Sequence, residues 1–143
     1  MRHLLDVNVL IALFDPDHAF HRRAHAWWGT TGRPWASSPI TENGLVRIMA
    51  APHYSRATRF PASGLTARLR AWADSSDHEF WPDTVSLRDP SHFQLEAVLS
   101  ARQLTDAYLL ALAIARGGCL ATFDQKLPVA AVIGATPDRI IVL

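Results

Sequence analysis

The stretch from His3 to Phe14, HLLDVNVLIALF, holds only two polar side chains after its first residue, Asp6 and Asn8. The two leucines before Asp6 are typical of a short buried strand, whereas the apolar segment 9–14 is too long to continue that strand. The break between them predicts Asp6 at the carboxyl end of the first strand, where the chain turns into a helix. Ligands bind at this edge of open α/β sheets, although a lone Asp here is more simply explained as a helix N-cap.

The composition is that of one compact globular domain. The chain has 143 residues, of which 49% are hydrophobic and 19% are charged, enough for a substantial core and too apolar for a disordered chain. The single cysteine, Cys119, excludes an intramolecular disulfide and fits a reducing compartment. The N-terminus does not look like a signal peptide, and no apolar stretch approaches the ~20 residues that span a bilayer. We therefore expect a soluble, cytoplasmic protein with no membrane segment.

The net charge gives no general attraction for nucleic acid, because it is only +1. All of the 14 basic residues except Lys126 are arginines, which suit bidentate phosphate contacts. A GC-rich genome, which the many alanines also indicate, explains this bias more simply.

Strands and helices are predicted to alternate along the chain. We expect strands at 4–5, within Arg33–Ser38, and at 79–81, 119–122 and 139–143, and helices at 9–14, 18–28, 41–49, from 61 onward, at 89–99 and at 105–115. Thr41 and Thr105 are the expected N-caps of their helices, and the histidines of segment 18–28 are expected on a solvated face, because no acid or cysteine completes a zinc set. This alternation predicts an α/β fold with a parallel sheet and right-handed crossovers.

Four carboxylates are predicted at one edge of that sheet. Asp6 and Asp124 follow strands, and Glu42 and Asp106 lie in the first turns of helices. Strand carboxyl ends and helix N-termini share an edge in a parallel α/β sheet, so the four acids should converge. Crowded like charges repel unless a cation intervenes, and hard oxygen ligands select magnesium or manganese over zinc. Such an ion activates water and stabilises a phosphoryl transition state.

The segments Leu5–Leu10, Thr41-Glu42, Leu104–Leu109 and Ala121–Asp124 resemble the motifs of PIN-domain proteins, in particular VapC-type ribonuclease toxins of bacterial type II toxin–antitoxin pairs. The resemblance covers essentially the whole chain. It implies one PIN domain over residues 1–143, folded as a three-layer α/β/α domain with a central, mainly parallel sheet. It further implies Mg²⁺-dependent endoribonuclease activity, with Mn²⁺ able to substitute, an RNA substrate, a homodimer, and inhibition by a cognate antitoxin.

The resemblance also assigns roles to individual residues. The catalytic acids would be Asp6, Glu42, Asp106 and Asp124. Of these, the metal ligands would be Asp6, Asp106 and Asp124. The supporting polar residues would be Asn8, Thr105 and Thr122. The chain departs from the family at Gln125-Lys126-Leu127, where a basic residue followed by a phenylalanine is common. This departure concerns the contacts of the loop and not the metal site.

Two other functions fit part of the sequence. A haloacid-dehalogenase-like phosphatase also has an Asp after the first strand, but it needs a second Asp where Asn8 stands and a downstream catalytic lysine, for which Lys126 is the only candidate. A PIN-like module could instead bind RNA or a partner without cutting, although the complete set of acids favours catalysis. An antitoxin segment would need an apolar groove, for which the helices that carry Phe20, Trp27/Trp28, Leu65, Leu69 and Trp72 are candidate walls.

Overall fold

The computed structural model describes residues 1–31 and 34–143. In these residues the chain forms the strands β1 (His3–Leu5), β2 (Trp35–Ser37), β3 (His78–Phe80), β4 (Cys119–Thr122) and β5 (Ile140–Val142), and the helices α1 (Val7–Phe14), α2 (His21–Thr30), α3 (Pro39–Met49), α4 (Ala62–Asp74) and α5 (Leu104–Ala115). Short 3-10 helices occupy Leu95–Ala97, Ala101–Gln103, Val129–Ala131 and Pro137–Arg139. Within the described part of the chain, no helix is long and apolar enough to cross a membrane.

The five strands form one parallel sheet in the order β3-β2-β1-β4-β5. The chain builds outward from β1 in one direction through β2 and β3, and then returns to place β4 on the other side of β1. The strand order therefore reverses between β1 and β4, where Leu5 is in register with Ala121. In open α/β sheets, ligands bind outside the carboxyl ends of the strands at such a reversal.

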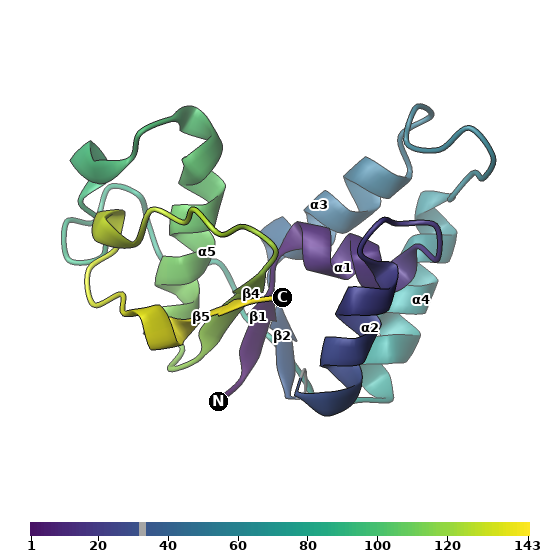
Figure 1. Ribbon diagram of the computed structural model, residues 1–143, viewed down its shortest axis with the longest axis horizontal. Coiled ribbons are helices and arrows are strands. Elements are labelled where there is room, and N and C mark those ends of the chain that lie inside the picture. The colour runs from purple at the N-terminus through teal and green to yellow at the C-terminus, as the bar shows by residue number, and fades with distance from the viewer. Residues whose placement is uncertain (32–33) are drawn as a thin grey trace.

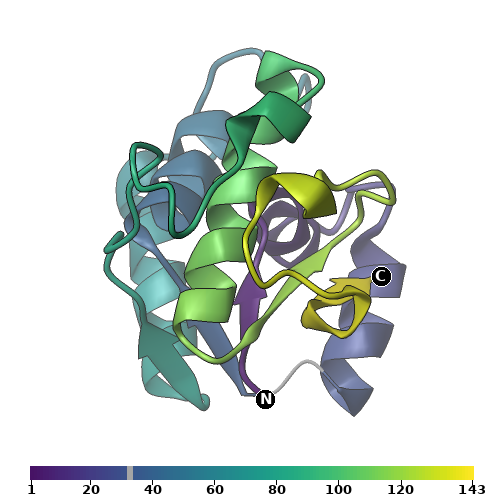
Figure 2. The ribbon, with the colours of Figure 1, turned by 90° about the vertical axis from the view of Figure 1, so that its left-hand side faces the viewer.

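Helices cover both faces of the sheet. Helices α1, α2, α3 and α4 pack on one face and α5 packs on the other, so that the sheet lies between two helical layers (Figures 1 and 2). The predicted three-layer α/β/α architecture is confirmed, and the sheet is parallel throughout.

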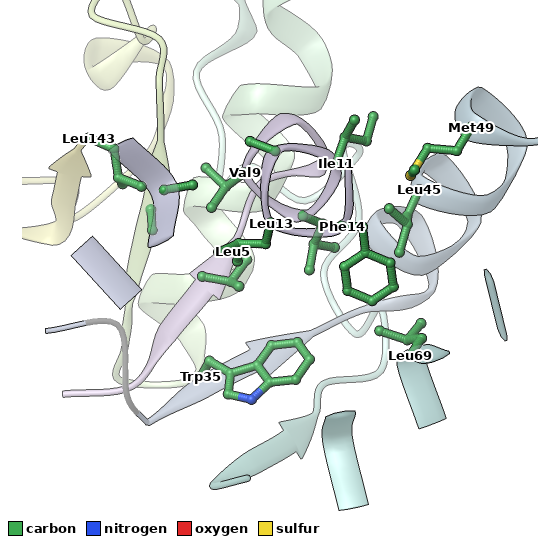
Figure 3. Packing of buried hydrophobic residues seen from close by; sticks show 14 of the residues in the cluster. Leu5, Val9, Ile11, Leu13, Phe14, Trp35, Leu45, Met49, Leu69 and Leu143 are labelled. Carbon is green, nitrogen blue, oxygen red and sulfur yellow. The ribbon is translucent and has the colours of Figure 1, made fainter. Parts of the chain in front are cut away.

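The core divides into one apolar cluster on each sheet face. Leu5 joins the α1–α4 side, with Val9, Leu45 and Leu69 (Figure 3), whereas its neighbour Leu4 joins the α5 side. Adjacent strand residues point to opposite faces, so the pair of leucines in β1 anchors both clusters. Both side chains are fully buried, so β1 is apolar toward both helical layers at these two positions.

Two predicted helix N-caps are wrong. Helix α3 begins at Pro39, and its N-cap is Ser38, which forms a reciprocal capping box with Thr41. The sequence Ser38-Pro39 is the signal, because proline is favoured at the first helical position. Helix α5 begins at Leu104, and Thr105 is no cap but lies in the first turn. The preceding 3-10 turn runs directly into α5, with Gln103 already in helical geometry, so no side-chain cap is needed.

The helix predicted at 89–99 is also wrong, because its backbone bonds elsewhere. The Asp89 carboxylate accepts hydrogen bonds from the backbone and hydroxyl of Ser91, a local turn that competes with a helix. The segment then pairs with residues 131–133, through Gln94 N to Ala131 O and Ile133 N to His92 O. Only Leu95–Ala97 forms a 3-10 turn.

The histidines of the second helix lie on its exposed or half-buried face, as predicted, and they also bond to α1. His21 Nδ1 lies 2.7 Å from Ala12 O and His25 Nε2 lies 3.0 Å from Leu13 O, so both rings donate to the last carbonyls of α1. The helix itself starts at His21, later than predicted, and continues through Gly29. The second predicted strand is found as Trp35–Ser37; its first expected residue, Arg33, lies outside the described residues.

Gly44 fixes how α3 meets the start of α1. A Cβ at this position would lie 2.7 Å from Val7 Cγ2, and the χ1 angle of a β-branched valine adjusts poorly. Glu42 precedes Gly44 in the first turn of α3, and Val7 follows Asp6. The close approach that the glycine permits therefore holds the helices of these two acids together.

Candidate functional site

Asp6 both caps α1 and faces the edge of the sheet. Its side chain is only 8% exposed, its Oδ1 accepts a hydrogen bond from Val7 N at 2.7 Å, and its Oδ2 accepts one from Thr122 Oγ1 at 2.9 Å. The N-cap role and the site role therefore belong to the same carboxylate. Burial raises the pKa of Asp6, the two hydrogen bonds lower it, and the charge of Asp124 raises it further.

Thr122, the last residue of β4, links two of the predicted acids. Its hydroxyl donates to Asp6 and accepts a hydrogen bond from Asp124 N at 3.1 Å. Asp124 is exposed, and its Oδ1 accepts a bond from Lys126 N at 2.8 Å. The loop Gln125-Lys126-Leu127 thus orients Asp124 through the backbone N–H of Lys126. This bond does not depend on the three side chains that depart from the family pattern.

Asp106 approaches the same place from the opposite sheet face. It lies in the first turn of α5, and burial, the charge of Asp6 and the charge of Asp124 raise its pKa from 3.8 to about 6. Asp6 follows β1, Asp124 follows β4, and Asp106 lies in the first turn of the helix that leads back into β4, so all three lie at the carboxyl edge of the parallel sheet. The structure therefore brings Asp6, Asp106 and Asp124 together where the strand order reverses.

No basic side chain of the described residues compensates the negative charge of these three aspartates. None of them forms a salt bridge with a lysine, arginine or histidine in residues 1–31 and 34–143. In the same residues, no group of three or more His, Cys, Asp or Glu side chains is arranged to hold a metal ion as it stands. The donor chemistry suits a hard divalent cation that keeps several waters and takes one or two carboxylates directly, as Mg²⁺ does.

Glu42 takes part in a hydrogen-bond group with Ser37 and His78. Ser37 Oγ, at the end of β2, donates to Glu42 Oε1 at 2.6 Å and lies 2.8 Å from His78 Nε2. Because the single hydroxyl proton of Ser37 goes to Glu42, the His78 ring supplies the proton of the second bond. Burial lowers the pKa of His78, against the charge of Glu42. Sequence reasoning missed Ser37 and His78; the only available signal was that Ser37 ends a buried strand.

The remaining predicted residues lie nearby without a common role. Asn8 and Thr105 are exposed in the first turns of α1 and α5. Among the predicted supporting residues, Thr122 is the one that contacts a predicted acid directly.

Comparison with known proteins places the chain in a family. A model of the family described as "PIN domain" matches residues 3–133. The chain is 47% identical over 145 residues to "Ribonuclease VapC44" of Mycobacterium tuberculosis, and the match covers 100% of both chains. It is 43% identical over 128 residues to "Ribonuclease VapC39", covering 89% of this chain and 91% of the relative, and 37% identical over 127 residues to "Ribonuclease VapC29", covering 89% of each.

The chain therefore belongs to the PIN domain family. The similarity to VapC44 extends over the whole sequence, and the similarity to VapC39 covers 89% of it.

Proposed function

We propose that this protein is a metal-dependent endoribonuclease and the toxin of a toxin–antitoxin pair. The observation that carries the proposal is the group of three aspartates at the strand reversal, which form no salt bridge within residues 1–31 and 34–143. The names of the relatives, which are ribonucleases of the VapC type, support RNA as the substrate. A phosphatase is not supported, because Asn8 stands where it would need its second acid and the family is a different one.

Asp6, Asp106 and Asp124 are the proposed ligands of Mg²⁺, or of Mn²⁺ in its place. When bound, the ion supplies Lewis acidity and lowers the pKa of a water. The bonds from Val7 N and Thr122 Oγ1 fix the orientation of the Asp6 carboxylate, and Lys126 N fixes that of Asp124. Burial and the charges of Asp6 and Asp124 raise the pKa of Asp106, and a bound cation would lower it again, so that Asp106 would be more fully ionised near neutral pH.

The proposed role of Glu42 is to orient the attacking water and not to bind the metal. With one oxygen taken by Ser37, its other oxygen is available to orient the attacking water toward the phosphate. Removal of a proton from that water by a positioned carboxylate is ordinary general-base chemistry.

The proposed regulator is a small antitoxin that inserts a segment into an apolar groove. A pocket of about 180 Å³ lies between α1, α2 and α4 and is lined by Leu13, Phe14, His25, Trp28, Arg68 and Trp72. An arginine of the partner would pair with the aspartates. We also propose that the protein forms a homodimer, which light scattering tests. We further propose that it acts in the cytoplasm, where cellular RNA is available, which cell fractionation tests.

The cleavage assay tests the enzyme class directly. Purified protein stripped of metal is incubated with single-stranded RNA in EDTA, in Mg²⁺ and in Mn²⁺. We expect internal cleavage in either metal, no cleavage in EDTA, and recovery when Mg²⁺ is restored. Cleavage that is undiminished in EDTA would contradict the metal proposal, and intact RNA in every condition would contradict the nuclease proposal.

Growth measurements test the toxin role separately. Production of the wild-type protein in bacteria should arrest growth, production of Asp6→Asn should not, and co-production of the protein encoded beside it should restore growth through a stable complex. Unchanged growth with abundant, folded, RNA-cleaving protein would remove the toxin role and leave the nuclease.

A further inference from the structure

A group of aromatic and basic side chains borders the aspartates. His18 and Phe20 lie between α1 and α2, Arg23 lies in α2, and Phe123 lies directly between Thr122 and Asp124. We call these four residues the Phe20–Phe123 patch. Phe123 directly precedes Asp124 in the chain, so the patch and the acidic site share one loop after β4.

The rings of the patch are in mutual contact. The centroids of Phe20 and Phe123 are 4.8 Å apart with the ring planes at 40°, and His18 lies parallel to Phe123 at 6.5 Å with an interplanar angle of 18°. The backbone of Phe20 also donates to His18 Nδ1 at 3.0 Å. These contacts keep the aromatic faces in a defined arrangement before any ligand arrives.

Arg23 supplies positive charge over the same rings. Its Cζ lies 5.7 Å from the centroid of Phe20 and 5.9 Å from that of Phe123. Arg23 is exposed, and it forms no salt bridge with any carboxylate in the described part of the chain. The guanidinium is therefore held by the rings, and its charge is available to an anion.

The exposure of Phe20 is not explained by packing. Phe123 packs partly against the α1–α4 core, whereas 41% of the surface of Phe20 is exposed. Phe20 offers an exposed aromatic ring, and Arg23 beside it forms no salt bridge within the described residues. Single-stranded nucleic acid has the complementary groups, because each base has an aromatic face and the next phosphate is negatively charged.

We propose that the Phe20–Phe123 patch binds the nucleotide next to the scissile phosphate of single-stranded RNA. The base stacks on Phe20 and Phe123, and Arg23 contacts the adjoining backbone phosphate. The choice of RNA rests on the proposed nuclease function. The patch is a local binding site for RNA on a protein whose net charge of +1 does not attract nucleic acid as a whole.

Binding of a short, fluorescently labelled, single-stranded oligoribonucleotide in EDTA tests the proposal without cleavage. Stacking on an aromatic side chain contributes ~1–3 kcal/mol per base, so Phe20→Ala should raise the Kd by about 5- to 100-fold. Phe20→Trp should retain binding, and Phe20→Leu, which keeps the apolar volume but not the ring, should resemble Phe20→Ala. The matched control is Phe80→Ala, at the opposite edge of the sheet, where the phenylalanine is 46% exposed.

The salt dependence of binding tests the phosphate contact. Loss of one phosphate contact to a single strand lowers the slope of log Kd against log salt by about 0.7, which we expect for Arg23→Gln. Arg116→Gln, at the far end of α5, should leave the slope unchanged. In the cleavage assay, Phe20→Ala should raise KM and leave kcat near the wild-type value.

The outcomes separate this proposal from the nuclease proposal. If the wild-type protein cleaves RNA but Phe20→Ala binds and cleaves as well as Phe80→Ala, the patch proposal is wrong and the nuclease stands. If RNA binding depends on Phe20 and Arg23 but no metal yields cleavage, the patch stands and the nuclease proposal fails. If Phe20→Ala weakens only the complex with the neighbour-encoded protein, the patch is a protein interface and RNA is not its ligand.

Discussion

Replacing Asp106 by asparagine should stabilise the metal-free protein, because it removes one of three crowded carboxylates and keeps the shape of the side chain. Burial and the charges of Asp6 and Asp124 raise the pKa of Asp106 from 3.8 to about 6. At 1.36 kcal/mol per pKa unit, ionising this group costs the folded protein about 3 kcal/mol relative to the unfolded chain. Since Asp106 is partly exposed, water screens part of this cost, and we expect a gain of about 1–3 kcal/mol.

The gain depends on pH in one direction. The folded Asp106 carboxyl binds its proton more tightly than the unfolded one, so its stabilising effect is complete below pH 3.8 and is lost as the pH rises through about 6. The difference between Asp106→Asn and wild type should therefore be near zero at about pH 3.5 and reach its full size at about pH 7.5.

Urea unfolding in EDTA at the two pH values measures this difference. Asp138→Asn is the control, because hydrogen bonds lower the pKa of Asp138 and its removal should not stabilise the protein at neutral pH. In saturating Mg²⁺, the wild type should recover stability that the variant does not. A gain of equal size at both pH values, or none near neutrality, would show that ionising Asp106 does not destabilise the folded protein.

Three further outcomes are expected. Gly44→Ala should lower the free energy of unfolding by about 1–3 kcal/mol, because the new Cβ overlaps Val7, whereas Gly29→Ala, with open space around it in α2, should raise it by about 0.5–1 kcal/mol in the same urea titration. Ser37→Ala should slow RNA cleavage by up to about a hundredfold with an unchanged circular dichroism spectrum, because Glu42 loses its donor; unchanged kcat would exclude this positioning role. Mn²⁺ at tenfold its Kd should stabilise the protein by about 1.4 kcal/mol at neutral pH and less at low pH, where protons compete for the carboxylates; a melting temperature indifferent to Mn²⁺ would exclude a metal site.

The positions of the three aspartates could be predicted because they follow from local pattern and chain order. Asp6 and Asp124 follow buried strands, Asp106 lies in the first turn of an apolar helix, and a parallel α/β sheet brings such positions to one edge. The confirmed fold class depends on the alternation of strands and helices along the chain. The apolar residues of β1 and α5 are enough to predict a buried strand and a buried helix.

The contacts around those positions could not be predicted, because they join residues that are distant along the chain. The bond from Ser37 to His78 spans 41 residues, and the contact between Phe20 and Phe123 joins the residue before α2 to the residue after β4. Sequence periodicity reports which face of an element is apolar, but not which neighbour it meets. The error at 89–99 has the same origin, since its backbone bonds go to residues 131–133.

The most direct measurement of the central claim is Mg²⁺-dependent cleavage of single-stranded RNA by Asp6→Asn, Asp106→Asn and Asp124→Asn, each compared with Asp138→Asn, a change of the same type at an exposed aspartate before β5. If the three aspartates form the catalytic centre, each of the first three variants loses roughly a hundredfold or more in kcat/KM, equivalent to about 2.7 kcal/mol of transition-state stabilisation, while Asp138→Asn retains wild-type activity. Cleavage by folded Asp6→Asn or Asp106→Asn at the rate of Asp138→Asn would contradict the account.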